Sequence, residues 1–316
     1  MSWKILINDG MEESGVNALK SLGFEVDTQK IPQEELSQKL QDYQGIIVRS
    51  ATKVRQELMD VCPGLKFIAR GGVGMDNIDV SYAKEKGIAV INTPAASSRS
   101  VAELAMAHLL SITRGLQDAN RQFSGGDQFS ALKKKWSTCS ELQGKTLLLL
   151  GFGRIGSELA KMATAMGMTV IVNDPYVEKA ILKIKLGTQE VEIQLQMVSR
   201  EEGLPLADYV SLHTPYTGSA LLGTDEFAII KKGCFVVNTS RGENIDEDAL
   251  LNALDSGKVS AAGLDVFQNE PHIKEALIHH PKICTSAHIG ASTLEAQERI
   301  AGELVDKINE IGRAHV

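Results

Sequence analysis

Three glycines stand at fixed spacing near the middle of the chain, where a strand-like segment gives way to a helix-like one. The apolar run 145–150 leads directly into Gly151, Gly153 and Gly156. Gly151 permits a tight turn, Gly153 lets the backbone approach a pyrophosphate, and Gly156 lets the helix pack against the strand. The N–H groups at the start of that helix favour an anion. The spacing therefore predicts a dinucleotide-binding turn.

An acidic residue follows the next apolar run at the position where such folds recognise ribose. Asp174 comes after the run 169–172, about 20 residues beyond the glycines, where a carboxylate binds the ribose hydroxyls. A carboxylate there disfavours a 2′-phosphate, and no Arg or Lys follows in 175–177. This pattern favours NAD over NADP. The alternative is a purely structural glycine turn with a surface aspartate.

Short apolar runs alternate with helical stretches along the whole chain and would position these residues. The runs are near-continuous, which is typical of strands buried on both faces of a parallel sheet. They are 4–7, 45–48, 66–69, 88–91, 145–150, 169–172, 209–212, 235–237, 262–266 and 283–285. We therefore predict an α/β protein with doubly wound parallel sheets.

The glycine turn lies so far along the chain that the preceding strands must form a separate domain. A length of 316 residues also favours two domains. Two long helices are predicted, one from Ser98 or Ser100 to Arg114, and one after a Ser292–Glu295 capping box. We expect them to be the crossings between two lobes that close on each other, with the cofactor in the cleft. Residues 176–200 are hard to assign, with 191–195 as a short strand or hairpin.

Composition narrows the classes of partner. The chain is 43% hydrophobic and 23% charged, and its net charge of -7 argues against a nucleic-acid partner. The four cysteines form no C-x-x-C pair and have no zinc-like spacing with histidine, so we expect no metal and reduced thiols. No apolar run approaches the roughly 20 residues of a membrane helix, and no signal peptide is evident. We expect a soluble cytoplasmic protein with no membrane partner.

Further segments, in order and at these separations, resemble the D-isomer-specific 2-hydroxyacid dehydrogenases along nearly the whole chain. They are 151–156, 213–215, 237–242, 263–267 with 270–271, and 288–293. The resemblance implies a Rossmann NAD-binding domain, residues 99–287, inserted in a flavodoxin-like substrate-binding domain, residues 1–98 plus 288–316. It also implies a homodimer built mainly through the NAD-binding domain.

The N-terminal half is most similar to the phosphoglycerate dehydrogenase branch of this family. The matching segments are 47–54, 70–79 and 92–94, with 103–104 further on. Three features depart from that branch. The chain ends at Val316, so we expect no C-terminal regulatory domain and no serine feedback. The stretch after Trp136 is short and lacks basic residues, and Ala95 and Ala96 occupy a loop that is more polar in some relatives.

Oxidation of a 2-hydroxy acid needs a base for the hydroxyl proton and a cation for the carboxylate, while the nicotinamide carries the hydride. The resemblance implies that His288 is the base. Histidine suits this role because the ordinary pKa of its side chain lies near neutral pH. Glu270 would orient its ring, and Arg241 would bind the carboxylate through its planar fork. Taken singly, each residue also has a non-catalytic interpretation. His288 could be a structural histidine, Glu270 part of a simple turn, and Arg241 a surface cation.

The resemblance also implies the binding residues. For the substrate phosphate we expect Arg49, Ser50, Arg70, Gly72, Val73, Gly74 and Asn77. For the cofactor we expect Gly151, Gly153, Arg154, Ile155, Gly156, Asp174, His213, Thr214, Pro215, Thr239, Ser240, Asp265 and Gly290. Asp265 would meet the nicotinamide carboxamide, whereas His108 would be a packing residue. Alternatively, Arg49 pairs with an acid and the glycines only make a turn.

The activity implied is NAD-dependent oxidation of 3-phospho-D-glycerate to 3-phosphooxypyruvate, at the entry to serine biosynthesis. A glyoxylate or hydroxypyruvate reductase of the same family is the nearest alternative, and it would need no phosphate pocket. An alternative from another class is a non-catalytic protein that senses NAD. The residues of the expected active site do not exclude it, because such relatives can retain them.

Overall fold

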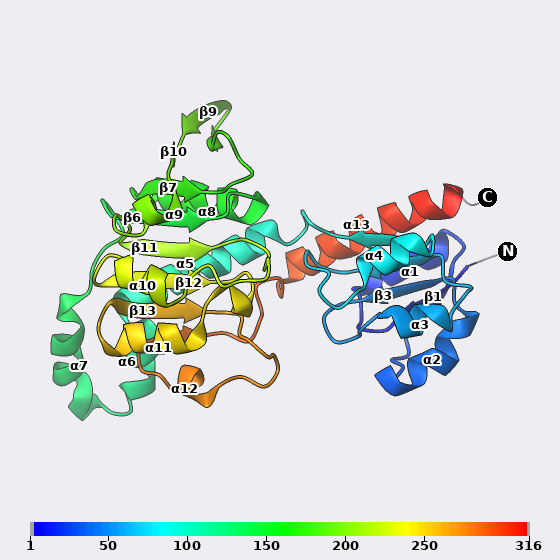
Figure 1. The fold of residues 1–316 in the computed structure, drawn as a ribbon, viewed down its shortest axis with the longest axis horizontal. Helices are drawn as coiled ribbons and strands as arrows, with labels where there is room; N and C mark the ends of the chain where they lie inside the picture. The colour runs from blue at the N-terminus through cyan, green and yellow to red at the C-terminus, as the bar shows by residue number, and fades with distance from the viewer. Residues whose placement is uncertain (1–2, 315–316) are drawn as a thin grey trace. The chain divides into compact units, whose positions relative to one another are not determined.

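The computed structural model describes residues 3–314 and divides into two compact units. The first unit comprises the residues up to Ser98 together with those from Ala291 onward. The second unit is the continuous segment Arg99–Gly290. Each unit is built on its own parallel sheet with helices, so the predicted α/β class is confirmed (Figure 1). No helix in residues 3–314 is long and apolar enough to cross a membrane.

The first unit contains a five-stranded parallel sheet in the order β2-β1-β3-β4-β5. This is the flavodoxin-like order of doubly wound sheets. Its strands are β1 Lys4–Ile7, β2 Glu25–Asp27, β3 Gly45–Val48, β4 Phe67–Arg70 and β5 Ala89–Asn92. Its helices are α1 Glu13–Ser21, α2 Leu36–Lys39, α3 Gln56–Asp60, α4 Val80–Glu85 and α13 Leu294–Ala314. The edge strand β2 was not predicted, because its residues form no apolar run.

Alternate residues of the central strands of the first unit face two separate hydrophobic clusters. Leu6 of β1 and Ile46 of β3 join one cluster, while Ile5 and Ile47 join the other. Burial on both faces explains the continuous apolar runs in the sequence. Helix α13 supplies an apolar stripe to the second cluster at helical spacing, namely Ile300, Leu304 and Ile308.

The N-terminus of α13 differs by one residue from the prediction. The helix begins at Leu294, and the hydroxyl of Thr293 accepts a hydrogen bond from the N–H of Ala296 at 3.2 Å. Thr293 therefore caps the helix, and the expectation that Ser292 does so is wrong. The physical reason is that the chain becomes helical one residue later than the Ser292–Glu295 pattern indicates.

The second unit contains a seven-stranded parallel sheet in the order β10-β7-β6-β11-β12-β13-β14. This is the order of a Rossmann fold, extended by one strand, with its switch point between β6 and β11. The strands are β6 Thr146–Leu150, β7 Thr169–Asn173, β10 Gln196–Met197, β11 Tyr209–Leu212, β12 Cys234–Asn238, β13 Val259–Leu264 and β14 Ile283–Thr285. The helices are α5 Ser98–Arg114, α6 Leu116–Gln122, α7 Phe129–Lys135, α8 Arg154–Ala165, α9 Arg200–Gly203, α10 Thr224–Ile229, α11 Glu247–Asp255 and α12 Glu275–Ile278.

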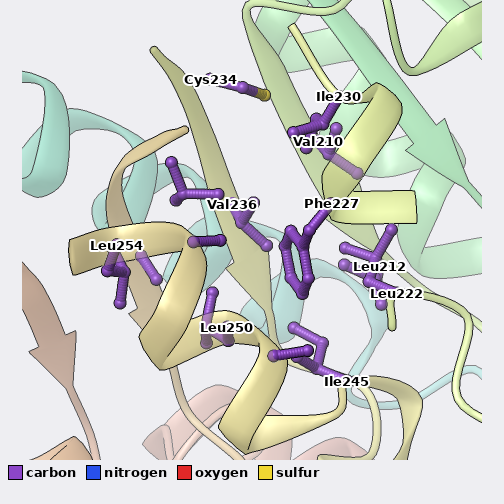
Figure 2. Packing of buried hydrophobic residues seen from close by; sticks show 14 of the residues in the cluster. Val210, Leu212, Leu222, Phe227, Ile230, Cys234, Val236, Ile245, Leu250 and Leu254 are labelled. Carbon is purple, nitrogen blue, oxygen red and sulfur yellow. The ribbon is translucent and has the colours of Figure 1, made fainter. Parts of the chain in front are cut away.

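Both faces of the seven-stranded sheet are covered by packed side chains. On one face, Phe227 of α10 and Leu250 of α11 pack with Val210 and Val236 of the sheet (Figure 2). On the other face, Leu147 and Leu149 of β6, for example, join a cluster with residues of α5 and α8. The packed sheet positions the carboxyl ends of its strands, where doubly wound folds bind ligands.

The segment that the sequence left unassigned contains an antiparallel hairpin beside α8, with β9 standing out at the edge of the unit (Figure 1). Strand β8 is Ile181–Leu186 and β9 is Gln189–Gln194. Leu182 and Ile193 pair across the hairpin and pack inward, while Lys183 bonds Glu192 at 2.8 Å on the outer face. The hairpin takes the place of a crossover helix between β7 and β10.

Candidate active site

The glycine turn after β6 has the geometry that its spacing predicts. Gly151 has φ +100°, and a Cβ there would lie 2.8 Å from the carbonyl oxygen of His213. A Cβ on Gly156 would lie 2.3 Å from the carbonyl oxygen of Gly151, so α8 could not pack this closely with a larger residue. A Cβ on Gly153, in contrast, would meet nothing within 4 Å. The turn therefore leaves open space at Gly153, which fits a phosphate approaching the first turn of α8.

Asp174, which follows β7, is bonded directly to this turn. One carboxylate oxygen accepts the N–H of Phe152 at 2.8 Å, and the other accepts the N–H of Tyr176 at 2.9 Å. The carboxylate thus lies at the edge of the glycine turn. This is where an acid can bind ribose hydroxyls next to a pyrophosphate.

The loops after β11 and β12 bring the other expected cofactor residues to the same edge of the sheet. Thr214 follows β11, and Thr239 and Ser240 follow β12. Asn244 bonds the carbonyl of Thr214 at 2.9 Å and the hydroxyl of Ser240 at 3.0 Å, which ties the two loops together. Asn244 was not predicted from the sequence, because a buried asparagine is recognisable only from its partners.

His213 is a half-buried imidazole beside the glycine turn. Its Nε2 lies 2.9 Å from the hydroxyl of Ser211, and burial lowers its pKa to about 4. The following Pro215 is exposed.

His288 and Glu270 form a close pair in the second unit. The Nδ1 of His288 lies 2.7 Å from Oε2 of Glu270, whose other oxygen accepts the N–H of Phe267 at 2.9 Å. Since the carboxylate can only accept, Nδ1 carries the proton and Nε2 is the ring atom that remains for chemistry. The His288 side chain is 46% exposed, so solvent and small molecules can reach it.

The pair shifts the proton affinity of both partners. The hydrogen bond to Glu270 raises the pKa of His288 above its ordinary value, with burial opposing. Burial alone would raise the pKa of Glu270, but the bonds from His288 and from the Phe267 N–H lower it overall. The positive charge of Arg241 lowers the pKa of both residues.

Arg241 follows β12, on a backbone that is fixed by the preceding asparagine. Asn238 donates to the carbonyl of Arg241 at 2.7 Å and accepts from the N–H of Ser240 at 3.0 Å. The arginine Nη1 donates to the carbonyl of Ser240 at 2.7 Å.

Asp265 and Gly290 lie close to His288. The N–H of Gly290 donates to the Asp265 carboxylate at 2.9 Å, and the N–H of His288 donates to the backbone carbonyl of Asp265 at 2.8 Å. The three expected catalytic residues therefore come together within one unit.

The expected substrate residues form a cluster at the carboxyl ends of β3 and β4 in the first unit. The Asn77 amide donates to the carbonyl of Arg49 at 2.8 Å and accepts from the Nε of Arg70 at 3.2 Å. The Nη1 of Arg70 lies 2.5 Å from where a Cβ on Gly72 would be. A Cβ on Gly71 would lie 3.7 Å from Cγ of Arg49, so both arginines flank the same glycine turn.

Nearby contacts fix this cluster. The Asp9 carboxylate accepts the N–H groups of Arg49 at 2.7 Å and of Thr52 at 3.0 Å, a role that the sequence did not indicate. The carbonyl of Val73 accepts a bond from Asn92 at 2.6 Å. Ser50 is exposed beside Arg49, and Gly74 continues the turn after Val73.

The model of the D-isomer specific 2-hydroxyacid dehydrogenase NAD-binding domain matches residues 106–290. The chain belongs to this family. Hydroxypyruvate reductase of Thermotoga maritima is 41% identical, over 98% of this chain and 99% of that protein. D-3-phosphoglycerate dehydrogenase of Methanocaldococcus jannaschii is 38% identical over 99% of this chain, which spans 58% of that longer protein.

A solved structure gives the same assignment. The NADPH-dependent glyoxylate/hydroxypyruvate reductase of Sinorhizobium meliloti, in complex with NADP and malonate, has a TM-score of 0.83 at 27% identity. That match covers 98% of this chain and 93% of the other. This dehydrogenase is therefore an oxidoreductase that uses a nicotinamide cofactor, with its cofactor-binding fold in the second unit.

Proposed function

We propose that this dehydrogenase oxidises 3-phospho-D-glycerate to 3-phosphooxypyruvate with NAD. The observation that carries the chemistry is the His288–Glu270 pair at 2.7 Å, at the edge of a dinucleotide-binding sheet, with the charge of Arg241 acting on both partners. A histidine–carboxylate pair and a cation are what proton removal from a 2-hydroxy acid requires.

In oxidation, Nε2 of His288 takes the proton of the C2 hydroxyl. Glu270 holds the ring in the Nδ1–H tautomer and stabilises the imidazolium as it forms. Arg241 binds the substrate carboxylate and polarises the C2 oxygen. A nicotinamide cofactor held by the glycine turn and Asp174 would supply the acceptor for the hydride that leaves C2. In the reverse reaction the protonated His288 returns its proton to the oxygen.

The cofactor would be held by the glycine turn through the pyrophosphate and by Asp174 through the ribose. The supporting observations are the open space at Gly153 and the bond from Phe152 to the Asp174 carboxylate. A carboxylate at this position repels a 2′-phosphate, so we propose NAD rather than NADP. Arg154, Ile155 and the loops that carry Thr214 and Thr239 would complete the site.

The cluster in the first unit would bind the substrate phosphate. Two guanidinium groups on either side of a glycine turn supply charge, and the N–H groups of Gly72 and Gly74 supply an anion nest. Ser50 and Asn77 would add hydrogen bonds. The phosphoglycerate dehydrogenase activity of the Methanocaldococcus relative supports this choice.

Reduction of hydroxypyruvate is the second candidate, and one observation favours it. The Thermotoga relative, a hydroxypyruvate reductase, is 41% identical and is matched over 99% of its length. That substrate lacks a phosphate, so its turnover should not depend on the arginine cluster.

Arginine substitutions separate the two candidates. We expect Arg49→Ala and Arg70→Ala each to lower kcat/KM for 3-phospho-D-glycerate by about 10- to 100-fold, as for a lost charge-assisted contact. The same variants should change kcat/KM for D-glycerate by less than about 3-fold. Equal effects on both acids would contradict a phosphate-binding role. Arg313→Ala, at an exposed arginine of α13, is a control for loss of surface charge.

We also propose a cytoplasmic homodimer, as the family resemblance implies. The residues that support an interface lie on α6, α7 and the turn between them. Leu116 is 65% exposed, Phe123 is 55% exposed and Phe129 is 58% exposed. Large apolar side chains gathered in this way at the surface are typical of association sites.

A further inference from the structure

A chain of hydrogen bonds connects His108, Ser286 and Asp265, next to the loop that contains His288. His108 on α5 places its Nε2 2.8 Å from the hydroxyl of Ser286, which follows β14. The Ser286 hydroxyl lies 2.6 Å from Oδ1 of Asp265, which follows β13. Three segments that are far apart in the sequence are thus joined within the second unit.

The chemistry of the three groups fixes the direction of these bonds. The carboxylate of Asp265 only accepts, so Ser286 uses its one proton to donate to it. Ser286 must then accept from His108, which requires a proton on Nε2. The Nδ1 of His108 is buried and has no hydrogen-bond partner in residues 3–314, as suits an unprotonated nitrogen. His108 is therefore a neutral donor in a single tautomer.

Burial agrees with a neutral ring. His108 is only 3% exposed, and desolvation lowers its pKa, although the charge of Asp265 opposes this. The ring also packs directly against β13, since a Cβ on Gly263 would lie 2.7 Å from Cβ and 3.0 Å from Nδ1 of His108. The His108 ring can pack here only because residue 263 is a glycine.

Asp265 in turn holds the backbone of the histidine loop. Its carbonyl accepts the N–H of His288 at 2.8 Å, and its two carboxylate oxygens accept the N–H groups of Ile289 and Gly290, each at 2.9 Å. His288 has φ +52°, a left-handed conformation that non-glycine residues rarely adopt. Such a conformation persists only where its surroundings hold it.

We propose that His108 and Ser286 are positioning residues for the catalytic histidine. They fix the Asp265 carboxylate, which holds the N–H groups of Ile289 and Gly290, while the Asp265 carbonyl holds that of His288. Together these bonds keep His288 aligned with Glu270. The inference rests on the proposed role of His288 as the base. It assigns His108 a function beyond packing. It predicts that residue 108 must donate a hydrogen bond to Ser286, and that a side chain of similar size without a donor cannot replace it.

Paired variants test the need for a donor. His108→Gln can still offer an N–H near the place of Nε2, whereas His108→Leu fills a similar volume without one. We expect kcat to fall about 10- to 100-fold in His108→Leu and Ser286→Ala, because a small misplacement of a reacting group costs this much. KM should change less than about 3-fold, and His108→Gln and Ser286→Thr should recover most of kcat. The exposed His279→Leu should behave as the unaltered enzyme.

A loss of packing alone would not give this pattern. It would lower kcat equally in His108→Gln and His108→Leu, which would overturn the proposal. The proposal also predicts that His108→Leu lowers the pKa of His288, measured by NMR of 15N-labelled histidine, because the bond to Glu270 loosens. An unchanged His288 pKa would count against it.

The same spectra separate this inference from the proposed function. His108 should show the Nε2–H tautomer and a pKa below its ordinary value of 6.5. An Nδ1–H tautomer would contradict the hydrogen-bond line even in an active enzyme. If the unaltered protein turns over no 2-hydroxy acid, the proposed function fails, while the tautomer and the His288 pKa still decide the structural part.

Discussion

The imidazole of His288 and the carboxylate of Glu270 each change the proton affinity of the other. The shared hydrogen bond raises the pKa of His288. In the proposed mechanism oxidation needs the neutral imidazole of His288, so we expect the rate of oxidation to rise as pH increases through that pKa. Reduction needs the imidazolium, which the raised pKa preserves to higher pH. A coupled pair of this kind titrates as a unit, and rate profiles report the pair.

The Glu270→Gln variant tests this coupling. We expect the acidic limb of kcat/KM for oxidation to lie above the ordinary pKa of 6.5 in the unaltered enzyme. In the variant the limb should move to lower pH, because the charge that stabilises the imidazolium is gone. Initial rates across a pH series measure it, with Glu275→Gln as a control. A limb that stays in place would show that Glu270 does not set the pKa of the base.

Replacing the base itself should separate chemistry from cofactor binding. We expect His288→Asn to lower kcat by about 10²- to 10⁴-fold, the usual contribution of a positioned acid–base group. The dissociation constant of NADH, measured by fluorescence, should change less than about 3-fold. A loss of NADH affinity as large as the loss of kcat would mean that His288 belongs to the cofactor site instead.

The Asp174 carboxylate tests the choice of cofactor at the same scale. We expect Asp174→Ala to weaken NAD binding about 10-fold and to narrow the preference for NAD over NADP, because the carboxylate no longer binds the hydroxyls or repels a 2′-phosphate. Steady-state kinetics with both cofactors measure this. An unchanged ratio of the two kcat/KM values would remove Asp174 from the cofactor site.

At the scale of elements, two glycines of the turn from β6 to α8 have different roles. Gly156 allows close packing of the backbone, and Gly153 leaves space for the cofactor in the proposed site. A Cβ on Gly156 meets backbone at 2.3 Å, whereas a Cβ on Gly153 meets nothing within 4 Å. We expect Gly156→Ala to lower the free energy of unfolding by more than about 1 kcal/mol, because the chain cannot accommodate the added methyl. Gly153→Ala should fold normally but bind NADH at least about 10-fold more weakly, since the methyl occupies the approach of the pyrophosphate.

Thermal unfolding and NADH titration of both variants measure this separation. Gly302→Ala in α13, where a Cβ also meets nothing within 4 Å, should leave the melting temperature equal or higher. Tight NADH binding by Gly153→Ala would contradict the role of that glycine.

Much of this fold was predictable from the sequence, for an identifiable reason. Strands buried on both faces, such as β6 and β11, leave continuous apolar runs that mark them directly. The edge strand β2 leaves no such run, because its residues are exposed or half-buried. The hairpin β8–β9 carries an alternating pattern, with Leu182 and Ile184 facing inward between lysines, in a place where a crossover helix is usual. Packing of β8 against α8 accompanies the hairpin rather than a crossover helix, and this tertiary contact cannot be read from the sequence.

The candidate site was only partly predictable. Arg241, Glu270 and His288 are far apart in sequence, and no spacing rule brings them together, so the resemblance to a family was needed to select them. Positioning contacts escaped prediction because they depend on three-dimensional neighbours. Asp9 under the arginine cluster and Ser286 beside Asp265 are ordinary polar residues until their partners are seen.

At the scale of the whole molecule, the exposed apolar surface of α6 and α7 bears on assembly. We expect Phe123→Ser combined with Phe129→Ser to shift the protein from dimer to monomer, because apolar area that an interface would bury is removed. Light scattering after size-exclusion chromatography gives the mass in solution. A dimer that survives both changes would place the interface elsewhere, and Tyr176→Ser, at a side chain that is 91% exposed, is the matched control.

The substrate is the central claim, and one comparison tests it most directly. The rate of NADH formation should be measured with 3-phospho-D-glycerate and with D-glycerate under identical conditions. We predict a kcat/KM at least about 10-fold higher for the phosphorylated acid, since in the proposed site its phosphate would meet the guanidinium groups of Arg49 and Arg70. Equal or reversed values would contradict the account and indicate the hydroxypyruvate reductase function. Turnover of neither acid, despite NADH binding, would contradict the proposed oxidation altogether.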